Sequence, residues 1–170
     1  FCYLTYDNVW GNFETFSLIG ESEILGMTLD KRHHYKFLWT SDNKILVLDN
    51  DGNKIILNPN NGSYDQSTKV NCIVQDMDGE LWIGTDKGIK VAYNIADIFE
   101  TNDGITSTTE CQNIIYQENG IAQYLLNFEN VTCMMIDGGN RKWVGTERNG
   151  IYVLSPSGDE QLYHFTAENS

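Results

Sequence analysis

The sequence has few prolines, few basic residues and no long apolar run. Its 170 residues include 2 Pro, and 11 Lys and Arg stand against 24 Asp and Glu, for a formal net charge of −13. A surface this acidic repels phosphate groups, so nucleic acids and anionic membrane surfaces are not expected partners. No apolar stretch approaches the roughly 20 residues of a membrane helix, so we expect no direct membrane insertion within this segment.

Close cysteine pairs are also lacking. The four cysteines Cys2, Cys72, Cys111 and Cys133 form no Cys-x-x-Cys pair, which argues against a zinc site of the ribbon type. Their apolar neighbours predict buried free thiols. The residues show no Ser/His/Asp or Cys/His constellation, so we predict no enzyme, no metal and no cofactor.

What is abundant is turn and strand chemistry. Glycine occurs 15 times and aromatic residues make up 12% of the chain, which is typical of short strands joined by tight turns. The chain begins at Phe1 without Met, inside an expected strand, which suggests an excised fragment. The lack of a targeting signal then says nothing about compartment.

An internal repeat decides the architecture. The stretch from Val70 to Tyr93 matches the stretch from Val131 to Leu154 at a constant spacing of 61 residues, with one insertion before the last glycine. The matched signature is Asp76, Trp82, Gly84, Thr85 and Gly88 in the earlier copy and Asp137, Trp143, Gly145, Thr146 and Gly150 in the later one. Because a four-stranded propeller blade typically repeats every 40–45 residues, the step of 61 residues corresponds to one blade plus an insertion of about 15.

A weaker copy precedes these two, from Ile24 to Leu48. Asp30 takes the place of Asp76, and Phe37 takes the place of Trp82. Trp39 stands where a glycine is expected, so this copy is degenerate.

The sequence therefore predicts an all-β fold, a β-propeller fragment of about three four-stranded antiparallel blades. In each copy a continuous apolar run, a turn and two further strands follow one another. Phe13 to Phe16 is expected to be an outer strand. The predicted bounds are residues 1–20 for the outer strands of a preceding blade, 24–64 for blade one, 70–127 for blade two with an inserted hairpin, and 131–166 for blade three.

The repeated residues have structural interpretations. Trp82 and Trp143 are expected to bury large apolar areas between neighbouring blades. Gly84 and Gly145 leave room for a close neighbour. The threonines can hydrogen-bond a nearby turn, and Asp76 and Asp137 are expected to cap turn amides.

At these residues the sequence resembles the two-component-regulator propeller repeat, whose signature is Asp, Gly, then Trp-Ile-Gly-Thr and a later Gly. The segment from Asn127 to Ser170 is similar to propeller proteins of the type IX (Por) secretion system of Bacteroidetes, and residues 114–126 fit the inserted hairpin of that group. This resemblance implies an exported protein at the periplasm, outer membrane or cell surface that contacts protein or glycan. It supplies no catalytic motif.

Three residues are candidates for binding. Arg141 and Lys142 are not repeated in the earlier copy, so they could guide an acidic partner, although the simpler interpretation is a pair of solvated hairpin residues. Trp39 is either inter-blade core or an exposed stacking platform for a sugar ring.

The predicted function is a non-enzymatic interaction module of an exported Bacteroidetes protein related to type IX secretion. The alternative is the periplasmic glycan-sensing propeller of a hybrid two-component regulator; a propeller hydrolase or lyase is a third hypothesis. The expected partner is a protein or a glycan. Three blades cannot close a ring, so we also expect two chains to pair as a homodimer, which could complete a six-bladed ring.

Overall fold

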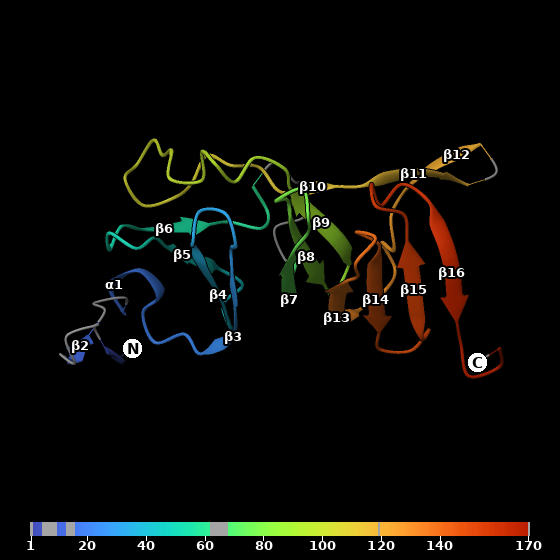
Figure 1. The fold of residues 1–170 in the computed structure, drawn as a ribbon, viewed down its shortest axis with the longest axis horizontal. Coiled ribbons are helices and arrows are strands. Elements are labelled where there is room, and N and C mark those ends of the chain that lie inside the picture. Colours follow the sequence, from blue (N-terminus) through green and yellow to red (C-terminus); the bar gives the residue numbers. More distant parts are fainter. Residues whose placement is uncertain (1, 5–9, 13–15, 62–67, 119, 170) are drawn as a thin grey trace.

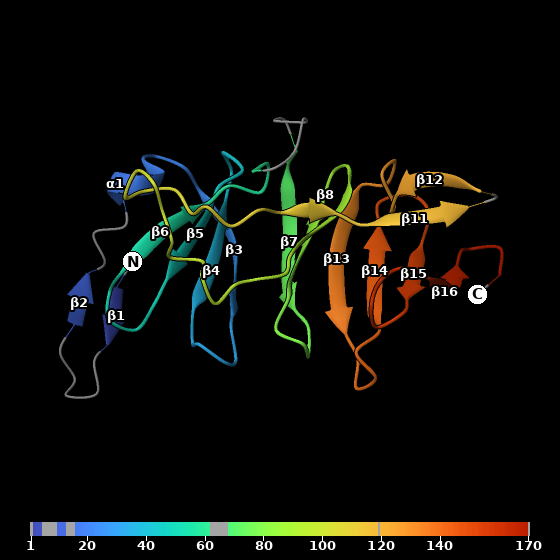
Figure 2. The same ribbon diagram turned by 90° about the horizontal axis from the view of Figure 1, so that it is seen from above.

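Three four-stranded antiparallel sheets lie side by side along the long axis of the molecule (Figures 1 and 2). The computed structural model describes residues 2–4, 10–12, 16–61, 68–118 and 120–169. Sheet 1 consists of β3 (Ile24–Leu29), β4 (Lys36–Thr40), β5 (Ile45–Leu48) and β6 (Lys54–Leu57). Sheet 2 consists of β7 (Val70–Gln75), β8 (Leu81–Thr85), β9 (Gly88–Ala92) and β10 (Gln112–Asn113). Sheet 3 consists of β13 (Val131–Ile136), β14 (Lys142–Thr146), β15 (Ile151–Leu154) and β16 (Gln161–Phe165).

The strands of each sheet follow one another in chain order, so the predicted all-β class with consecutive antiparallel blades is confirmed. The first strands β3, β7 and β13 are neighbours from sheet to sheet. A helix of one turn, α1 (Phe16–Ile19), precedes sheet 1, and β1 (Cys2–Leu4) pairs with β2 (Trp10–Asn12). The strand expected over 13–16 is wrong at Phe16, which begins α1; residues 13–15 lie outside the described residues.

Apolar side chains fill both junctions between sheets. One core cluster joins Phe37 and Val47 of sheet 1 to Ile73 and Ile83 of sheet 2. A second cluster between sheets 2 and 3 is built around Trp82, which is fully buried. Its inter-sheet role is therefore as predicted.

Trp143 differs from its repeat partner. Side chains alternate along β14, so Lys142 and Val144 point towards sheet 2 and Trp143 points to the opposite face. Trp143 is half-buried and stacks on Phe165 with 6.2 Å between ring centroids. The expected burial between two sheets is wrong for this tryptophan, because no described sheet covers the outer face of sheet 3.

Each first strand has the same irregularity, a register shift between its first and third residues. The third residue then faces the motif position of the second strand, as Cys72↔Gly84, Cys133↔Gly145 and Gly26↔Trp39. Each pair holds one glycine, and in sheet 1 the glycine has moved to the first strand. The Trp39 ring packs where a Gly26 side chain would lie. The large and the small residue have therefore exchanged strands in this copy, and the pair still fills the same space.

The connection between β9 and β10 ties sheets 1 and 2 together. It runs back over β6 (Figure 1), where the Ile56 amide donates to the Ile105 carbonyl at 2.9 Å and the Ser107 amide donates to the Ile56 carbonyl at 2.8 Å. The inserted hairpin is present as β11 (Ile115–Glu118) paired with β12 (Ile121–Tyr124). The return of the connection to sheet 1 and the two-residue strand β10 were not predicted, because neither has an apolar repeat.

Two glycine substitutions test the packing at the repeated motif. A methyl group on Gly84 would lie 2.5 Å from Cys72 Sγ and 2.7 Å from Val131 Cγ1, whereas one on Gly145 would crowd Cys133 Sγ alone, at 2.6 Å. We expect Gly84→Ala to lower the free energy of unfolding by about 1–3 kcal/mol, and Gly145→Ala by less than about 1 kcal/mol, because Cys133 is exposed and can rotate away. Urea unfolding of both variants measures the difference; equal losses would contradict this packing.

Candidate functional site

The turns between the first and second strands carry most of the polar contacts between sheets. Each turn opens with an aspartate: Asp30, Asp76 or Asp137. Asp76 Oδ1 accepts the amides of Asp78 at 3.0 Å and Glu80 at 2.9 Å. Asp137 Oδ1 accepts the corresponding amides, at 2.9 and 3.0 Å. The predicted capping of turn amides is confirmed.

The second carboxylate oxygen holds the motif tryptophan. Trp82 Nε1 donates to Asp76 Oδ2 at 3.2 Å, and Trp143 Nε1 donates to Asp137 Oδ2 at 2.9 Å. A buried indole N–H needs an acceptor, so the Asp and Trp of the signature act as one unit six residues apart. The constant spacing of six residues between Asp and Trp in both copies indicates this pair, but the sequence analysis did not predict it.

The left-handed position of each turn is taken by a different type of residue. His34, Gly79 and Asn140 have φ angles of 60°, 93° and 60°, whereas Gly138 and Gly139 do not have positive φ. Asparagine tolerates this conformation better than most residues. Its side chain is then used between sheets: Asn140 Nδ2 donates to Asp78 Oδ2 at 2.8 Å, and Asn140 Oδ1 accepts the Met77 amide at 2.9 Å.

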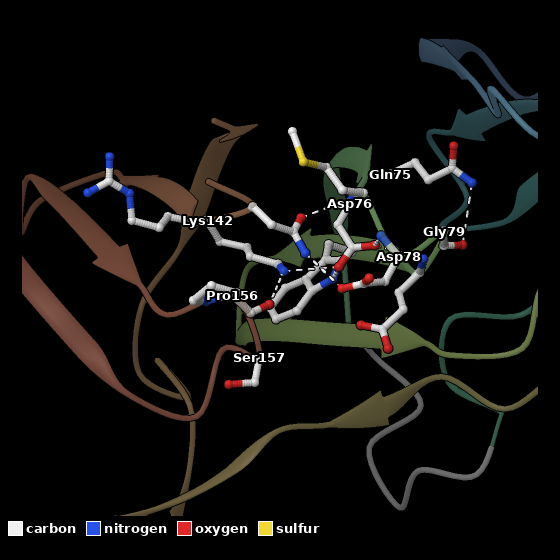
Figure 3. Close-up of polar contacts among 12 residues, drawn as sticks. Gln75, Asp76, Asp78, Gly79, Lys142, Pro156 and Ser157 are labelled. Atoms are coloured by element: carbon white, nitrogen blue, oxygen red, sulfur yellow. Dashed lines mark hydrogen bonds and ion pairs between the residues drawn. The ribbon is translucent and has the colours of Figure 1, made fainter. Parts of the chain in front are cut away.

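Lys142 is the main correction to the sequence analysis. The prediction of a solvated hairpin residue is wrong, because its side chain is fully buried. Its ammonium lies 2.9 Å from Asp76 Oδ2 and 4.5 Å from the centroid of the Trp82 ring, and it also donates to the Pro156 carbonyl (Figure 3). Lys142 therefore joins sheet 3 to sheet 2 and is not available to a partner.

The buried pair shifts the acidity of its carboxylate. Burial alone would raise the pKa of Asp76, but the hydrogen bond from Lys142, the Glu80 amide, the Lys142 charge and the Trp82 indole together lower it. Burial and the charge of Asp76 raise the pKa of the neighbouring Glu80. Asp76 therefore stays ionised opposite the Lys142 ammonium.

At the junction between sheets 1 and 2, the neutral amide of Gln75 takes the place of the lysine at the aspartate. Gln75 Nε2 donates to Asp30 Oδ1, and the Lys31 amide donates to Gln75 Oε1 at 3.0 Å. Arg32 donates to the carbonyls of Asp78 at 2.5 Å and Met77 at 2.6 Å. Each junction thus satisfies the aspartate of one sheet with a side chain of the next.

Arg141 remains partly accessible. Its Nε lies 2.7 Å from Asp137 Oδ2, and 41% of its side chain is exposed. The hydrogen bond from the Trp143 indole is the largest cause of a lowered pKa at Asp137. Burial opposes it, and the backbone amides of Arg141 and Gly139 and the Arg141 side chain lower the pKa further. Trp39 belongs to sheet 1 and is half-buried against the first core cluster, so the structure does not bring Trp39 and Arg141 into one site.

The Thr and Gly of the signature shape the next turn. Thr85 Oγ1 donates to the Gly88 carbonyl at 2.9 Å, and Thr146 Oγ1 donates to the Gly150 carbonyl at 3.0 Å, as predicted for a turn contact. Gly88 has a φ of 87°, and a side chain there would lie 2.7 Å from the carbonyl oxygens of Leu125 and Leu126. Glycine is therefore required at Gly88 by both conformation and space.

The polar groups of these turns serve the fold. Within the described residues no group of three or more His, Cys, Asp and Glu side chains could hold a metal ion. No helix in that part of the chain is long and apolar enough to cross a membrane. Every buried side-chain nitrogen or oxygen described has a hydrogen-bond partner, so the turn network is a structural junction.

Comparison with known proteins supports this architecture. Residues 65–87 match the family model described as two component regulator propeller. No curated protein matches the chain. Over 99% of its length the chain superposes with a TM-score of 0.81 on PorZ, a surface component of the type IX secretion system of Porphyromonas gingivalis, at 23% identity and over 24% of that protein.

Two structures from B. thetaiotaomicron share the fold. The extracellular domain ascribed to the hybrid two component system BT3049 gives a TM-score of 0.57 at 20% identity, over 89% of this chain and 17% of that one. The extracellular domain ascribed to the one component system BT4673 gives 0.59 at 16% identity, over 99% and 22%. The chain spans a quarter or less of each structure, and the likeness shows the β-propeller fold.

Replacing Lys142 tests the buried junction. We expect Lys142→Met to lower the free energy of unfolding by about 3–5 kcal/mol, because it leaves Asp76 buried without its cation. The pKa of Asp76 should then rise. A carboxylate whose pKa is lowered in the folded state stabilises the fold at pH values above its unfolded pKa of about 3.9, and this stabilisation is lost as the pH falls through the folded pKa. Because Lys142→Met raises the folded pKa of Asp76, its acid unfolding transition should move to higher pH.

Arg141→Gln is the matched control, because it removes the neighbouring cation from a partly exposed ion pair. Its loss should stay within about 1 kcal/mol. Urea unfolding at pH 7 and acid titration followed by circular dichroism give both numbers. A Lys142→Met protein as stable as the parent, with Arg141→Gln the weaker variant, would contradict the assignment.

Proposed function

We propose that this chain is part of a non-enzymatic interaction module of an exported Bacteroidetes protein related to type IX secretion. The observation that carries the proposal is the superposition on the PorZ surface component over 99% of the chain. The turn carboxylates support a non-enzymatic role, because Asp76 and Asp137 are each saturated by amide, indole and cationic donors. Such groups hold sheets together and are not free for acid–base chemistry.

The same comparison supports export to the periplasm or cell surface. The three structures compared above are described as surface or extracellular parts of their proteins. The acidic composition, with a net charge of −13, suits contact with a protein or glycan and disfavours nucleic acid.

A second candidate function is ligand sensing in a two-component regulator, with a glycan as the ligand. The match of residues 65–87 to the two component regulator propeller family favours it. Trp39 and Arg141 remain the residues proposed from sequence for ligand contact. They would act as separate contacts, since they lie in sheets 1 and 3.

We also propose that two copies pair through the outer face of sheet 3. That face repeats the face of sheet 2 that sheet 3 covers, and it exposes 57% of Met135, 54% of Tyr163 and 37% of Phe165. The far face of sheet 1 is partly covered by Ile19 of α1. If sheet 3 of one copy pairs with sheet 3 of the other, α1 can therefore stay in place. A six-bladed ring of two copies would require α1 to move.

Deletion of the gene in its native host tests the secretion role. We expect cargo of the type IX system to fall in the medium and accumulate in the periplasm, because a surface module of that system would be missing. Quantitative immunoblotting of both fractions, with protease shaving of an epitope-tagged protein on intact cells, gives the measurement. Normal cargo release combined with a changed transcriptional response to glycans would support the sensor instead.

Tyr163→Glu and Met27→Glu test the pairing surface. Tyr163→Glu should convert a dimer to a monomer in light scattering, since it places a charge in the proposed interface. Met27, which is 55% exposed on β3 of sheet 1, is the control, and Met27→Glu should remain dimeric. The exposed Cys133 thiol, followed by peptide mapping, should be alkylated faster in the monomer. A parent chain that is monomeric at high concentration, or a dimer broken by Met27→Glu, would exclude this pairing.

A further inference from the structure

A groove lies between the inserted hairpin and the outer strands of sheet 3, and we call it the hairpin groove. Both ribbon views place β11 and β12 beside β15 and β16 (Figures 1 and 2). Its walls include five rings and one carboxylate, from Tyr116, Tyr124, Phe128, Tyr152, His164 and Glu129. None of its lining residues is a lysine or an arginine. The groove is therefore aromatic and acidic.

The rings form a floor and an open wall. On the floor, Tyr152 is buried and stacks on His164 with 3.9 Å between ring centroids. On the wall, Tyr124 is 50% exposed and Phe128 is 89% exposed. Aromatic rings of this size contribute large contact areas at interfaces. Phe128, nearly bare in the chain, has area to offer a partner.

The exposed ring stands on a fixed turn. Leu126 has a φ of 52°, an uncommon conformation for a bulky residue. The turn is held on both sides: the Leu125 amide donates to the Ile114 carbonyl at 2.8 Å, and the Gly88 amide donates to the Glu129 carbonyl at 2.9 Å. Backbone strain of this kind is found at ligand clamps. The backbone of this turn, and not contacts of its own side chain, therefore fixes the position of Phe128.

The carboxylate has one oxygen to spare. Glu129 Oε1 accepts Asn149 Nδ2 at 2.7 Å and the Tyr152 hydroxyl at 3.5 Å. Oε2 has no hydrogen bond or ion pair within the described part of the chain. A fixed carboxylate beside several aromatic faces is complementary to a cation, which the ring faces attract as well.

We propose that the hairpin groove binds a lysine or arginine side chain of a partner polypeptide. This deepens the proposed function, on which it rests, by naming the chemistry of the partner. The cation would lie between Glu129 and the rings of Tyr124 and Phe128, and the net charge of −13 would speed its approach. The lining offers an anionic ligand no lysine or arginine to pair with.

Titration of the isolated chain with N-acetyl-arginine amide tests the proposal. The neutral isostere N-acetyl-citrulline amide is the first control, because it keeps the shape and loses the charge. We expect saturable ¹⁵N–¹H shifts at Phe128, Glu129 and His164 with the arginine probe, and binding at least about fivefold weaker with citrulline. Salt should weaken the arginine complex.

Two carboxylate variants complete the design. Glu129→Gln keeps an acceptor for Asn149 and should lose at least about fivefold in affinity, while Phe128→Ala should also weaken binding. Glu147→Gln is the matched control: it removes a carboxylate from the adjacent turn, where Glu147 pairs with Arg148 at 3.7 Å, and should bind as the parent does.

Equal shifts with arginine and citrulline, or no loss in Glu129→Gln, would overturn the proposal. Saturable shifts with cellobiose and none with arginine would overturn it in favour of a saccharide. The titration needs no cellular phenotype, so its failure is separable from that of the secretion role. Normal cargo release with an intact arginine complex would overturn the secretion role alone.

Discussion

The carboxylate of Asp76 is the contact on which the stack of sheets depends. It receives two amides of its own turn, the indole of Trp82 and the ammonium of Lys142 from the next sheet. One side chain thereby fixes a turn, orients the largest residue of the core and joins two sheets. Burying an ion pair stabilises a fold only when the remaining hydrogen bonds are satisfied, and here each carboxylate oxygen has two donors.

The sequence predicted the sheets because their signature is local and repeated. Asp, Trp, Gly and Thr recur at the same spacing since each performs the same contact in sheets 2 and 3. The prediction for Lys142 was wrong because a lysine in a hairpin is usually solvated, and its partners on sheet 2, Asp76 and Trp82, lie 60 or more residues away along the chain. One signal was available: the matching residue of the earlier copy is Leu81, which is fully buried.

Asn140 and Trp39 show why the other differences escaped sequence reasoning. The first turn of sheet 3 contains the paired glycines Gly138 and Gly139, yet its left-handed residue is Asn140. Only the neighbouring sheet explains this choice, since the amide side chain bridges to Met77 and Asp78. Trp39 looked like a lost glycine, but the register places Gly26 directly across from it. Compensation between strands is visible only once the register is known.

The repeated residues and the sites proposed for function occupy different parts of the chain. Asp76 and Lys142 bond to each other across two sheets, and Trp82 and Asp137 form their hydrogen bonds within their own sheets. A partner could reach these groups only by breaking those contacts. The hairpin groove instead combines residues of the segment 115–129, which has no counterpart in the other copies, with Tyr152 and His164 of sheet 3. Because the framework does not depend on the exposed ring of Phe128, that residue can vary without loss of the fold. In the proposed complex the exposed rings and the carboxylate come from the insertion, and the repeat supplies the rigid support that holds them in place.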